Sequence, residues 1–450
     1  MTGRVAAAEE RAFSITLGAQ GQMTWRGKIL GIVLLAIVAA LGAAAHFVYK
    51  PALPPIAPPD PQNFDKALVA QGQALAAIGD CAVCHTARED AALAGGRALA
   101  TPFGTLFSTN ITPDAKTGIG RWSEAAFVRA MREGVSRDGT YLYPAFPYDH
   151  FTHVDDADLQ AIYAYLMTRR PIDSHAPANE LRWPYDFRPL LAGWDLLFQH
   201  KIPFVADPAQ DAEWNRGAYL VEGLGHCGAC HTPRNALGAE HAHQAFAGGV
   251  IEGWYAPPLN AANPAVEPWT ADRLEAYFHT GIDLDHAAAA GPMGPVVHDL
   301  AAAPMADRKA IAVYVAWLMR DSPAAIGKRR PPLDRADYAQ QEHARGATLF
   351  AGACATCHGA GAPMMLQGRP PLEKGSPLQE ADPRDTIAII LHGLAPPVDA
   401  NGPYMPAFAD EFSDTEIDEI VAYLRARFSD GPAWADLAHA VASARKEGAS

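Results

Sequence analysis

Three copies of one short motif constrain this chain more than any other feature of its sequence. The motif is C-x-x-C-H, it uses all 6 cysteines, and its copies are Cys81-Ala-Val-Cys84-His85, Cys227-Gly-Ala-Cys230-His231 and Cys354-Ala-Thr-Cys357-His358. This spacing is the attachment signature of c-type haem. Two thiols one helical turn apart form thioethers to the ring, and the adjacent histidine ligates the iron. The sequence therefore predicts three covalently bound haem c groups, with His85, His231 and His358 as iron ligands.

A single C-x-x-C pair has two other uses, as a redox dithiol or as half of a zinc site. A zinc site needs two such pairs close together in the sequence, whereas these pairs begin at residues 81, 227 and 354. Three matches that leave no cysteine over therefore favour haem attachment.

Length and charge narrow the class of protein further. At roughly 150 residues per domain, the 450 residues correspond to about three domains. The formal charge is 36 − 50 = −14, so a polyanionic nucleic acid would be repelled. The sequence contains no phosphate-binding G-x-x-x-x-G-K-[ST] loop and no dinucleotide-binding unit. We therefore expect redox centres without a nucleic-acid partner and without a substrate site on this chain.

An apolar stretch near the N-terminus predicts a membrane segment. Residues 29–49 are 21 residues without a formal charge, just long enough to span a bilayer. Arg26 and Lys28 precede it, which favours a cytoplasmic segment over 1–28 and haem domains in the periplasm. We expect an N-terminal anchor in a bacterial inner membrane, followed by a proline-rich spacer over 50–62. The alternative is a cleaved signal peptide that ends at the alanine run.

The three motifs lie in similar surroundings. A glycine in a helical stretch precedes each motif, a proline-containing loop follows it, and an amphipathic helix and an aromatic-bearing helix come next. Small residues on the first helix that face aromatic residues on the last permit a close helix crossing. The preceding glycines are Gly72, Gly217 and Gly346. The expected N-caps of the middle helices are Ser123 and Thr270, and the expected closing residues are Gly134, Gly281 and Gly393.

This repetition predicts an all-α fold of three tandem haem domains after an N-terminal transmembrane helix. Ordinary amphipathic helices would not share one order of features around each motif. The domains are expected at 63–172, 209–325 and 335–430, with a linker at 173–208 and a C-terminal tail at 431–450.

Several stretches outside the haem motifs carry a family resemblance. They include Asn110-Ile-Thr-Pro-Asp114, Tyr143-Pro-Ala-Phe-Pro-Tyr148 and Arg216-Gly-Ala-Tyr-Leu-Val-Glu222. Each unit resembles a class I cytochrome c domain, and residues 60–430 resemble the triple-haem cytochrome subunit of membrane-bound periplasmic dehydrogenases. Such subunits serve quinoprotein alcohol dehydrogenases, flavin-dependent gluconate or sorbitol dehydrogenases, and molybdenum hydroxylases. The stretches Tyr148-Asp-His-Phe-Thr152 and Arg188-Pro-Leu-Leu-Ala-Gly-Trp194 are most similar to partners of molybdenum hydroxylases.

The resemblance implies an electron-transfer subunit that is not an enzyme on its own. It would pass electrons from a molybdopterin, quinoprotein or flavin dehydrogenase subunit to ubiquinone at the membrane, with a small iron–sulfur subunit as a further candidate partner. Two alternatives are a multihaem peroxidase or reductase acting at haem 1 and a haem module of a terminal oxidase. The apolar segment Pro189–Phe198 is a candidate docking or membrane-facing element, with a plain core helix as its alternative.

Register within the repeats indicates candidate sixth ligands of the haem irons. Methionine is a common second axial ligand of haem c and raises its potential. Met293 and Met405 lie twelve residues after Gly281 and Gly393, respectively. We therefore predict Met293 and Met405 as ligands of haems 2 and 3. The methionines off this register, which we expect to be packing residues, are Met305, Met364 and Met365.

The same offset in the first repeat reaches Phe146, which cannot ligate iron. Related sequences often carry methionine here, so this chain departs from the pattern at haem 1. His150, four residues further on, is the predicted sixth ligand of haem 1, and the alternatives are His153 or no protein ligand. Met131 and Met167 are expected in the core. The histidines expected to titrate in solvent are His241, His243 and His286.

Overall fold

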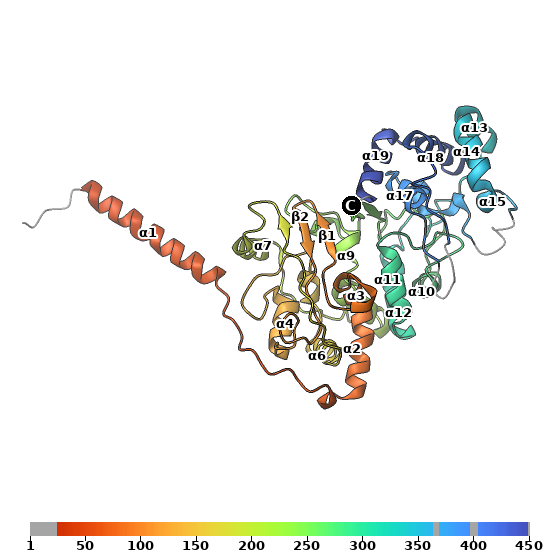
Figure 1. The fold of residues 1–450 in the computed structure, drawn as a ribbon. Coiled ribbons are helices and arrows are strands. Elements are labelled where there is room, and N and C mark those ends of the chain that lie inside the picture. Colours follow the sequence, from red (N-terminus) through yellow and green to blue (C-terminus); the bar gives the residue numbers. More distant parts are fainter. Residues whose placement is uncertain (1–24, 363–368, 397–403, 449–450) are drawn as a thin grey trace, which may run out of the picture. The chain divides into compact units, whose positions relative to one another are not determined.

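The computed structural model describes residues 25–362, 369–396 and 404–448, and the chain divides into two compact units, residues 1–50 and 51–450 (Figure 1). In the first unit, the described residues form one helix, α1 (Trp25–Val48). The second unit contains the three haem motifs and all other described helices and strands. Met364 and Met365 lie outside the described residues.

The structure contradicts the predicted transmembrane helix over residues 29–49. Within the described part of the chain, no helix combines enough length with enough apolar character to cross a membrane. The apolar run instead forms part of α1, which begins at Trp25 and takes in Arg26 and Lys28, two charges that disfavour burial in hydrocarbon. The predicted location rested on this transmembrane helix, so the N-terminal anchor in a bacterial inner membrane is wrong as well.

The expectation of an all-α fold is also wrong, because short antiparallel strands follow the first two haem motifs. A three-stranded sheet contains β1 (Ala98–Thr101), β2 (Gly104–Phe107) and β3 (Glu180–Leu181), and a second sheet contains β4 (Gly249–Ile251) and β5 (Trp254–Ala256). Two residues join β4 to β5, and both have positive φ, 47° at Glu252 and 80° at Gly253. Two positive φ angles match the twist of paired strands, so this loop closes as a hairpin.

In each repeat, the first helix crosses the last one at a glycine. The crossing pairs are α2 (Lys66–Ile78) with α6 (Asp156–Met167), α8 (Ala212–Tyr219) with α12 (Met305–Leu318), and α14 (Ala344–Leu349) with α18 (Asp414–Phe428) (Figure 1). A Cβ built on Gly72, Gly217 or Gly346 would lie 1.9, 2.0 or 2.1 Å from a backbone carbonyl oxygen of the last helix. The same atom would meet the Cβ of Tyr165, Tyr314 or Tyr423 at 2.9, 2.8 or 2.8 Å. The predicted contact between a small and an aromatic residue is confirmed in all three repeats.

The middle helices begin and end where the sequence predicts. They are α4 (Glu124–Glu133), α10 (Ala271–Thr280) and α17 (Arg384–His392). The hydroxyl oxygens of Ser123 and Thr270 accept hydrogen bonds from backbone N–H groups three residues further on. Gly134 and Gly281 close their helices with φ of 62° and 80°, the left-handed conformation that glycine adopts without steric cost. Gly393 ends α17.

The remaining helices are short connections or additions to this frame. They are α3 (Cys81–His85), α5 (Tyr148–Phe151), α7 (Leu191–Phe198), α9 (Gly228–His231), α11 (Met293–Ala301), α13 (Ala336–Glu342), α15 (Ala355–His358), α16 (Ser376–Gln379) and α19 (Leu437–Gly448). α19 packs against α17 and α18, and its Val441 is buried. The expected C-terminal tail, residues 431–450, therefore adds a helix to the core of the third repeat.

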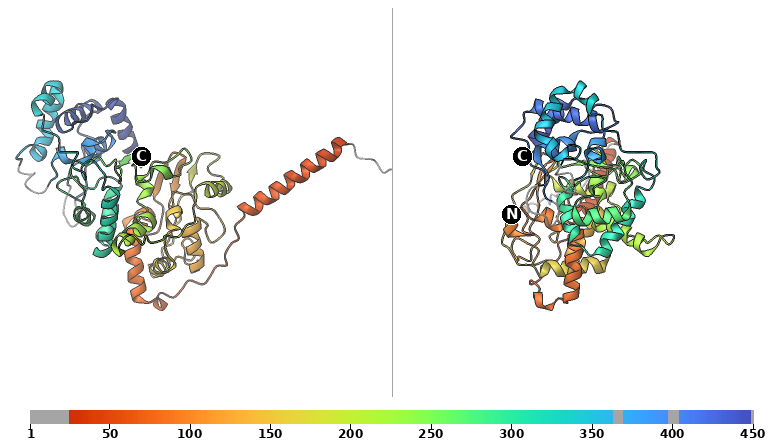
Figure 2. Two further views of the ribbon diagram at one scale, coloured as in Figure 1. Left: turned by 180° about the vertical axis from the view of Figure 1, so that it is seen from behind. Right: turned by 90° about the vertical axis from the view of Figure 1, so that its right-hand side faces the viewer.

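Buried apolar side chains form two separate cores. One core draws on the first two repeats together, and it includes Leu75, Ile162, Leu220 and Tyr314. The other belongs to the third repeat, and it includes Ile387 and Ile420. Both views in Figure 2 place the third repeat, in blue, at one end of the second unit. The first two haem motifs therefore belong to repeats that share one hydrophobic core, and the third repeat has a core of its own.

We expect Gly346→Ala to destabilise the third repeat. The added methyl group would lie 2.1 Å from the carbonyl oxygen of Glu419, so α14 and α18 would have to move apart. Overpacking of this kind costs about 1–3 kcal/mol in the free energy of unfolding. Denaturant unfolding followed by circular dichroism would measure the loss.

Gly352→Ala is the matched control, because a Cβ built on Gly352 would meet no atom within 4 Å apart from its chain neighbours and the backbone of its own helix. It should leave the unfolding transition unchanged or slightly raised. Equal losses of stability in both variants would contradict the crossing argument.

Candidate functional site

The six cysteines lie in pairs on or beside three short helices. α3 contains Cys81 and Cys84, α9 follows Cys227 and contains Cys230, and α15 follows Cys354 and contains Cys357. All six thiols are free and partly exposed. Burial raises the pKa of Cys81 and of Cys227 to about 12, so these are protonated thiols and not the activated thiolates of a redox dithiol. Free thiols one helical turn apart fit the attachment of c-type haem.

The predicted proximal histidines of the first two motifs are each held in one tautomer. His85 Nδ1 lies 2.6 Å from the carbonyl oxygen of Thr109, and His231 Nδ1 lies 2.6 Å from that of Pro257. Because a carbonyl can only accept, Nδ1–H donates in both, and Nε2 keeps the lone pair that iron requires. Burial lowers the pKa of His85 and of His231, which keeps both imidazoles neutral at pH 7. The donor sets of the first two motifs therefore fit a proximal haem ligand.

The third proximal histidine has a different surrounding. Burial also lowers the pKa of His358. Its Nδ1 is buried and has no hydrogen-bond partner among the residues that the structure describes. The sequence Pro370-Pro371-Leu372 repeats Pro257-Pro258-Leu259, but the carbonyl of Pro370 does not accept a hydrogen bond from His358 as that of Pro257 does from His231.

The first two motifs approach each other at their cysteine ends. Burial is the main cause that raises the pKa of Cys230 to about 11, and the charges of Asp80 and Cys84 from the first motif add to it. Leu224 lies against the start of the first motif, because a Cβ built on Gly79 would be 3.0 Å from its Cδ1. The cysteine pairs that would hold the first two haem groups therefore lie close to each other.

Met293 and Phe146 occupy equivalent places in the second and first repeats. Each loop after the middle helix is closed by one bridge, and these bridges are Val135–Tyr141 and Ile282–Ala288. Phe146 and Met293 both stand five residues after their bridge. Both are partly buried against the first core. The predicted register between these two repeats is confirmed, and the ligand role of Met293 stays a prediction.

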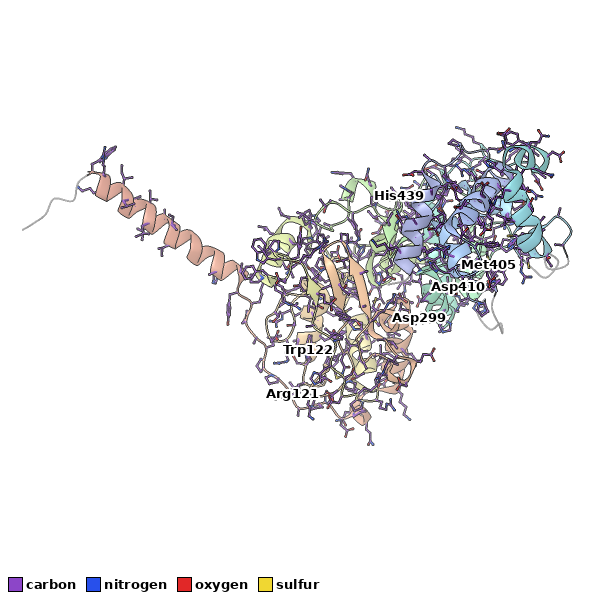
Figure 3. The ribbon with its side chains drawn as sticks, turned by 45° about the horizontal axis from the view of Figure 1, so that its top comes forward. Arg121, Trp122, Asp299, Met405, Asp410 and His439 are labelled. Carbon is purple, nitrogen blue, oxygen red and sulfur yellow. The ribbon has the colours of Figure 1, made fainter. Side chains whose placement is uncertain are left out.

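Met405 does not share this place in its own loop (Figure 3). It forms the bridge itself, pairing with Leu394 through hydrogen bonds of 3.0 and 3.2 Å. Met405 lies twelve residues after Gly393, as Met293 lies twelve residues after Gly281. The two methionines nevertheless occupy different positions, because the loop of the third repeat has more residues between the two that form its bridge. Met405 packs against the core of the third repeat, and its ligand role stays a prediction.

His150 lies between the first two repeats. Its Nδ1 is 2.8 Å from the carbonyl oxygen of Glu222, and its Nε2 is 2.7 Å from Oε1 of Glu240. Burial alone would lower the pKa of His150, but the hydrogen bond and charge of Glu240 raise it to about 9. Both ring nitrogens therefore donate at neutral pH. Ligation of haem 1 by His150 would require Nε2 to leave Glu240, and this assignment stays a prediction.

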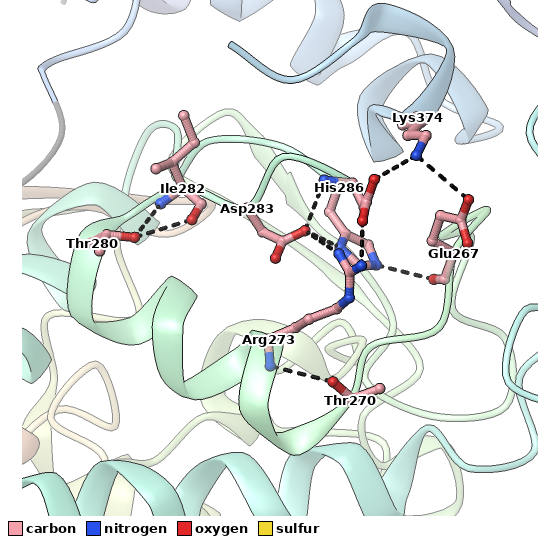
Figure 4. Close-up of polar contacts among 9 residues, drawn as sticks. Glu267, Thr270, Arg273, Thr280, Ile282, Asp283, His286 and Lys374 are labelled. Carbon is pink, nitrogen blue, oxygen red and sulfur yellow. Dashed lines mark hydrogen bonds and ion pairs between the residues drawn. The ribbon is translucent and has the colours of Figure 1, made fainter. Parts of the chain in front are cut away.

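His286 is fully buried, so the expectation that its side chain lies in solvent is wrong. Its ring stacks on Trp269, with ring centroids 3.5 Å apart and 15° between the planes. Its Nδ1 lies 2.7 Å from Oδ1 of Asp283, and its Nε2 lies 3.0 Å from the carbonyl oxygen of Glu267 (Figure 4). Two hydrogen bonds and a stacked ring offset the cost of burying a polar side chain. His241 and His243 are exposed, as expected.

The methionines that were expected to be core or packing residues differ in their burial. Met131 and Met167 are buried in the first core, as expected. Met305, the first residue of α12, is 69% exposed, so the expectation that it is a packing residue is wrong. A helix start that projects from the core explains its exposure.

The apolar segment Pro189–Phe198 contains α7. Ala192 is buried, whereas Leu196 and Leu197 are 69% and 62% exposed. The alternative of a plain core helix is therefore wrong for these two leucines. Leu196 and Leu197 therefore form an exposed apolar surface, and its predicted role in docking can be tested.

Sequence reasoning missed the charged residues that join the repeats. Glu240, Lys374 and Asp385 are charged residues in a loop, a short turn and a first helical turn, and such residues are typical of solvated surface. No sequence signal distinguishes them. Asp80 was also missed, although its place directly before a haem motif was an available signal. Burial, followed by the charge of Asp299 on α11, raises the pKa of Asp80 to about 7.

Two cytochrome families match parts of the chain. The cytochrome c family matches residues 69–170. The family of subunit III of cbb3-type cytochrome c oxidases matches residues 341–424. These matches fall on the first and third repeats.

Three known proteins are similar over most of the chain. A nicotinate dehydrogenase subunit of Pseudomonas putida is 46% identical over 425 residues, which is 94% of this chain but 35% of that protein. The fructose dehydrogenase cytochrome subunit of Gluconobacter japonicus is 34% identical over 83% of this chain and 82% of its own length. The gluconate 2-dehydrogenase cytochrome c subunit of Pantoea cypripedii is 36% identical, with 85% and 90% covered. The chain thus spans about a third of the first protein and most of the other two.

We expect the contact between the first two repeats to weaken as pH rises through about 9. The pKa of His150 is raised from 6.5 to about 9 in the folded chain, so its contribution to stability is complete below 6.5 and is lost as pH passes the folded value. The free energy of unfolding of the first two repeats, measured from about pH 6 to about pH 10, would show this loss.

Glu240→Gln removes the partner charge and should flatten that pH dependence. Parallel losses in the wild type and in Glu240→Gln would contradict the assignment. A bis-histidine electron paramagnetic resonance signal that disappears in His150→Ala would instead make His150 a ligand of haem 1.

Proposed function

The chain belongs to the family of cytochrome c subunits of dehydrogenase complexes, and from this premise we propose that its three haem sites form one electron path. It is an electron-transfer subunit and not a catalytic one. The observation that carries the proposal is the threefold repeat of C-x-x-C-H, with the first two motifs adjoining over one core. The haem-attachment motifs also support an extracytoplasmic location. A peroxidase or reductase acting at haem 1 is not favoured, because the relatives are dehydrogenase subunits.

The residues present fit haem c. His85, His231 and His358 would ligate the irons through Nε2, and the paired cysteines would hold the rings. Met293 and Met405 are the proposed sixth ligands of haems 2 and 3. When bound, haem c supplies a one-electron centre whose potential follows its axial ligands. Phe146, which cannot ligate iron, occupies in the first repeat the position that Met293 occupies in the second. Haem 1 is therefore proposed to differ from haem 2 in potential.

We propose a molybdenum hydroxylase as the catalytic partner, acting on an N-heterocycle or an aldehyde. The identity of 46% with the nicotinate dehydrogenase subunit, against 34% and 36% with the fructose and gluconate dehydrogenase subunits, supports this choice. That relative extends far beyond the matched part, so its remaining length is a candidate counterpart of the partner. Ubiquinone as acceptor and a small iron–sulfur subunit as further partner follow from the family resemblance.

We expect nicotinate to reduce three haems per chain in the complex copurified with its catalytic subunit. Haem absorption would follow the reduction, and a pyridine haemochrome assay would count the haems. Dithionite is the control, because it should reduce all three whichever substrate the partner uses. Reduction by gluconate or ethanol in place of nicotinate would contradict the partner class, and two haems per chain would contradict the haem count.

We expect Met293→Ala to lower the potential of one haem, because the lost thioether favours ferrous iron. The near-infrared methionine–iron band should weaken, and Met405→Ala should have the same effect on a second haem. Potentiometric titration would measure both. Met305→Ala is the matched control, since Met305 is exposed, and it should change no potential. Unchanged potentials in Met293→Ala would show that the register argument fails.

A further inference from the structure

The third repeat contacts both segments that carry the proposed axial ligands of haem 2. One contact is made by Asp385 on the side of His231, and the other by Lys374 on the side of Met293. We propose that Lys374 and Asp385 are positioning residues for haem 2, so that docking of the third repeat sets the ligand geometry of the second. This inference rests on the proposed ligands His231 and Met293.

On the proximal side, the contact runs through β5. The backbone N–H of Tyr255 in β5 donates to Oδ1 of Asp385 over 2.8 Å. Two residues later, the carbonyl oxygen of Pro257 accepts from Nδ1 of His231 over 2.6 Å. Asp385 is buried in the first turn of α17, where a rigid helix fixes its carboxylate. A side chain of the third repeat therefore holds the strand that leads to the partner of His231.

On the distal side, the contact is made to the loop that leads to Met293. The ammonium group of Lys374 bonds the carboxylate of Asp285 and lies 3.6 Å from Oε1 of Glu267 (Figure 4). Lys374 ends a short turn, Leu372–Lys374, that follows two prolines, so its backbone is restrained. Lys374 of the third repeat thus contacts the chain on both sides of α10, at Glu267 before the helix and at Asp285 after it.

The charges around this loop explain why Lys374 matters. Asp283, Asp285 and Glu267 bring three carboxylates together, and within the second repeat Arg273 supplies the guanidinium that faces two of them. Lys374 adds the cation that the second repeat lacks at this edge. Its hydrogen bond to Asp285 lowers the pKa of that carboxyl and raises that of Lys374, so both stay charged at neutral pH.

Loss of Lys374 would leave Asp285 and Glu267 in mutual repulsion beside one arginine. His286, stacked on Trp269 and bonded to Asp283, would still hold the middle of the loop. The end that leads to Met293 would therefore loosen while the fold of the second repeat persists. Because a proposed thioether ligand reports on such loosening through its iron bond, the effect can be measured at haem 2.

The test uses the full-length, haem-loaded protein with Lys374→Ala, Asp385→Ala and the conservative Lys374→Arg. We expect Lys374→Ala to speed backbone hydrogen exchange over residues 282–293 by about tenfold, to weaken the methionine–iron band and to lower the potential of one haem. Asp385→Ala should speed exchange over residues 254–257. Lys374→Arg should restore both the exchange rate and the potential.

Lys309→Ala is the matched control, because Lys309 forms a half-exposed ion pair of 3.6 Å with Glu213 within the second repeat. It removes the same charge and should change neither exchange nor potential. Wild-type exchange over 282–293 in Lys374→Ala overturns the proposal, and so does an unchanged haem potential. Met293→Ala separates the two failures: if it too leaves every potential unchanged, the ligand assignment fails, and the exchange rates alone decide the positioning role.

Discussion

A glycine that lies directly against a backbone carbonyl is the contact on which each haem domain depends. At Gly72, Gly217 and Gly346, an added Cβ would fall about 2 Å from an oxygen of the last helix, well inside van der Waals contact. Since the haem motif begins eight to ten residues after each glycine, this crossing places the cysteines and the proximal histidine against the rest of the repeat. The loops that supply the histidine partners, Thr109 and Pro257, can then approach from the other side.

The three repeats are joined in two physically different ways. The first two share one apolar core and a partly buried pair between His150 and Glu240, so their separation is set by close packing. The third meets the second through polar contacts of Lys374 and Asp385. Exposed charge pairs are screened by salt, whereas apolar cores are not. The partly exposed ion pair of Lys374 with Asp285 should therefore be more sensitive to ionic strength than the apolar core that the first two repeats share.

The features that follow from local spacing could be predicted, and those that depend on distant partners could not. The haem motifs, the caps at Ser123 and Thr270, and the small-to-aromatic crossings all depend on residues at fixed offsets. His286 was expected in solvent because nothing near it in the sequence indicates that Trp269 and Glu267 would enclose it. Met405 shows a second kind of error. It has the same sequence offset from its glycine as Met293, but it occupies a different hydrogen-bonded position in its loop. The strands were missed because they are only two to four residues long, and only the Glu252-Gly253 turn marks one of the hairpins.

The sequence by itself determined the number of haem-attachment motifs, the identity of their cysteines and histidines, and the repeat that surrounds them. Those features are covalent chemistry and short-range geometry, and both are written in residues close together along the chain. Only the tertiary structure decided that the first two repeats share a core, that both nitrogens of His150 are engaged, and that the third repeat contacts both segments of the second that carry the proposed ligands. Such contacts join residues up to 130 positions apart, and their free energy depends on burial and distance that no local pattern specifies.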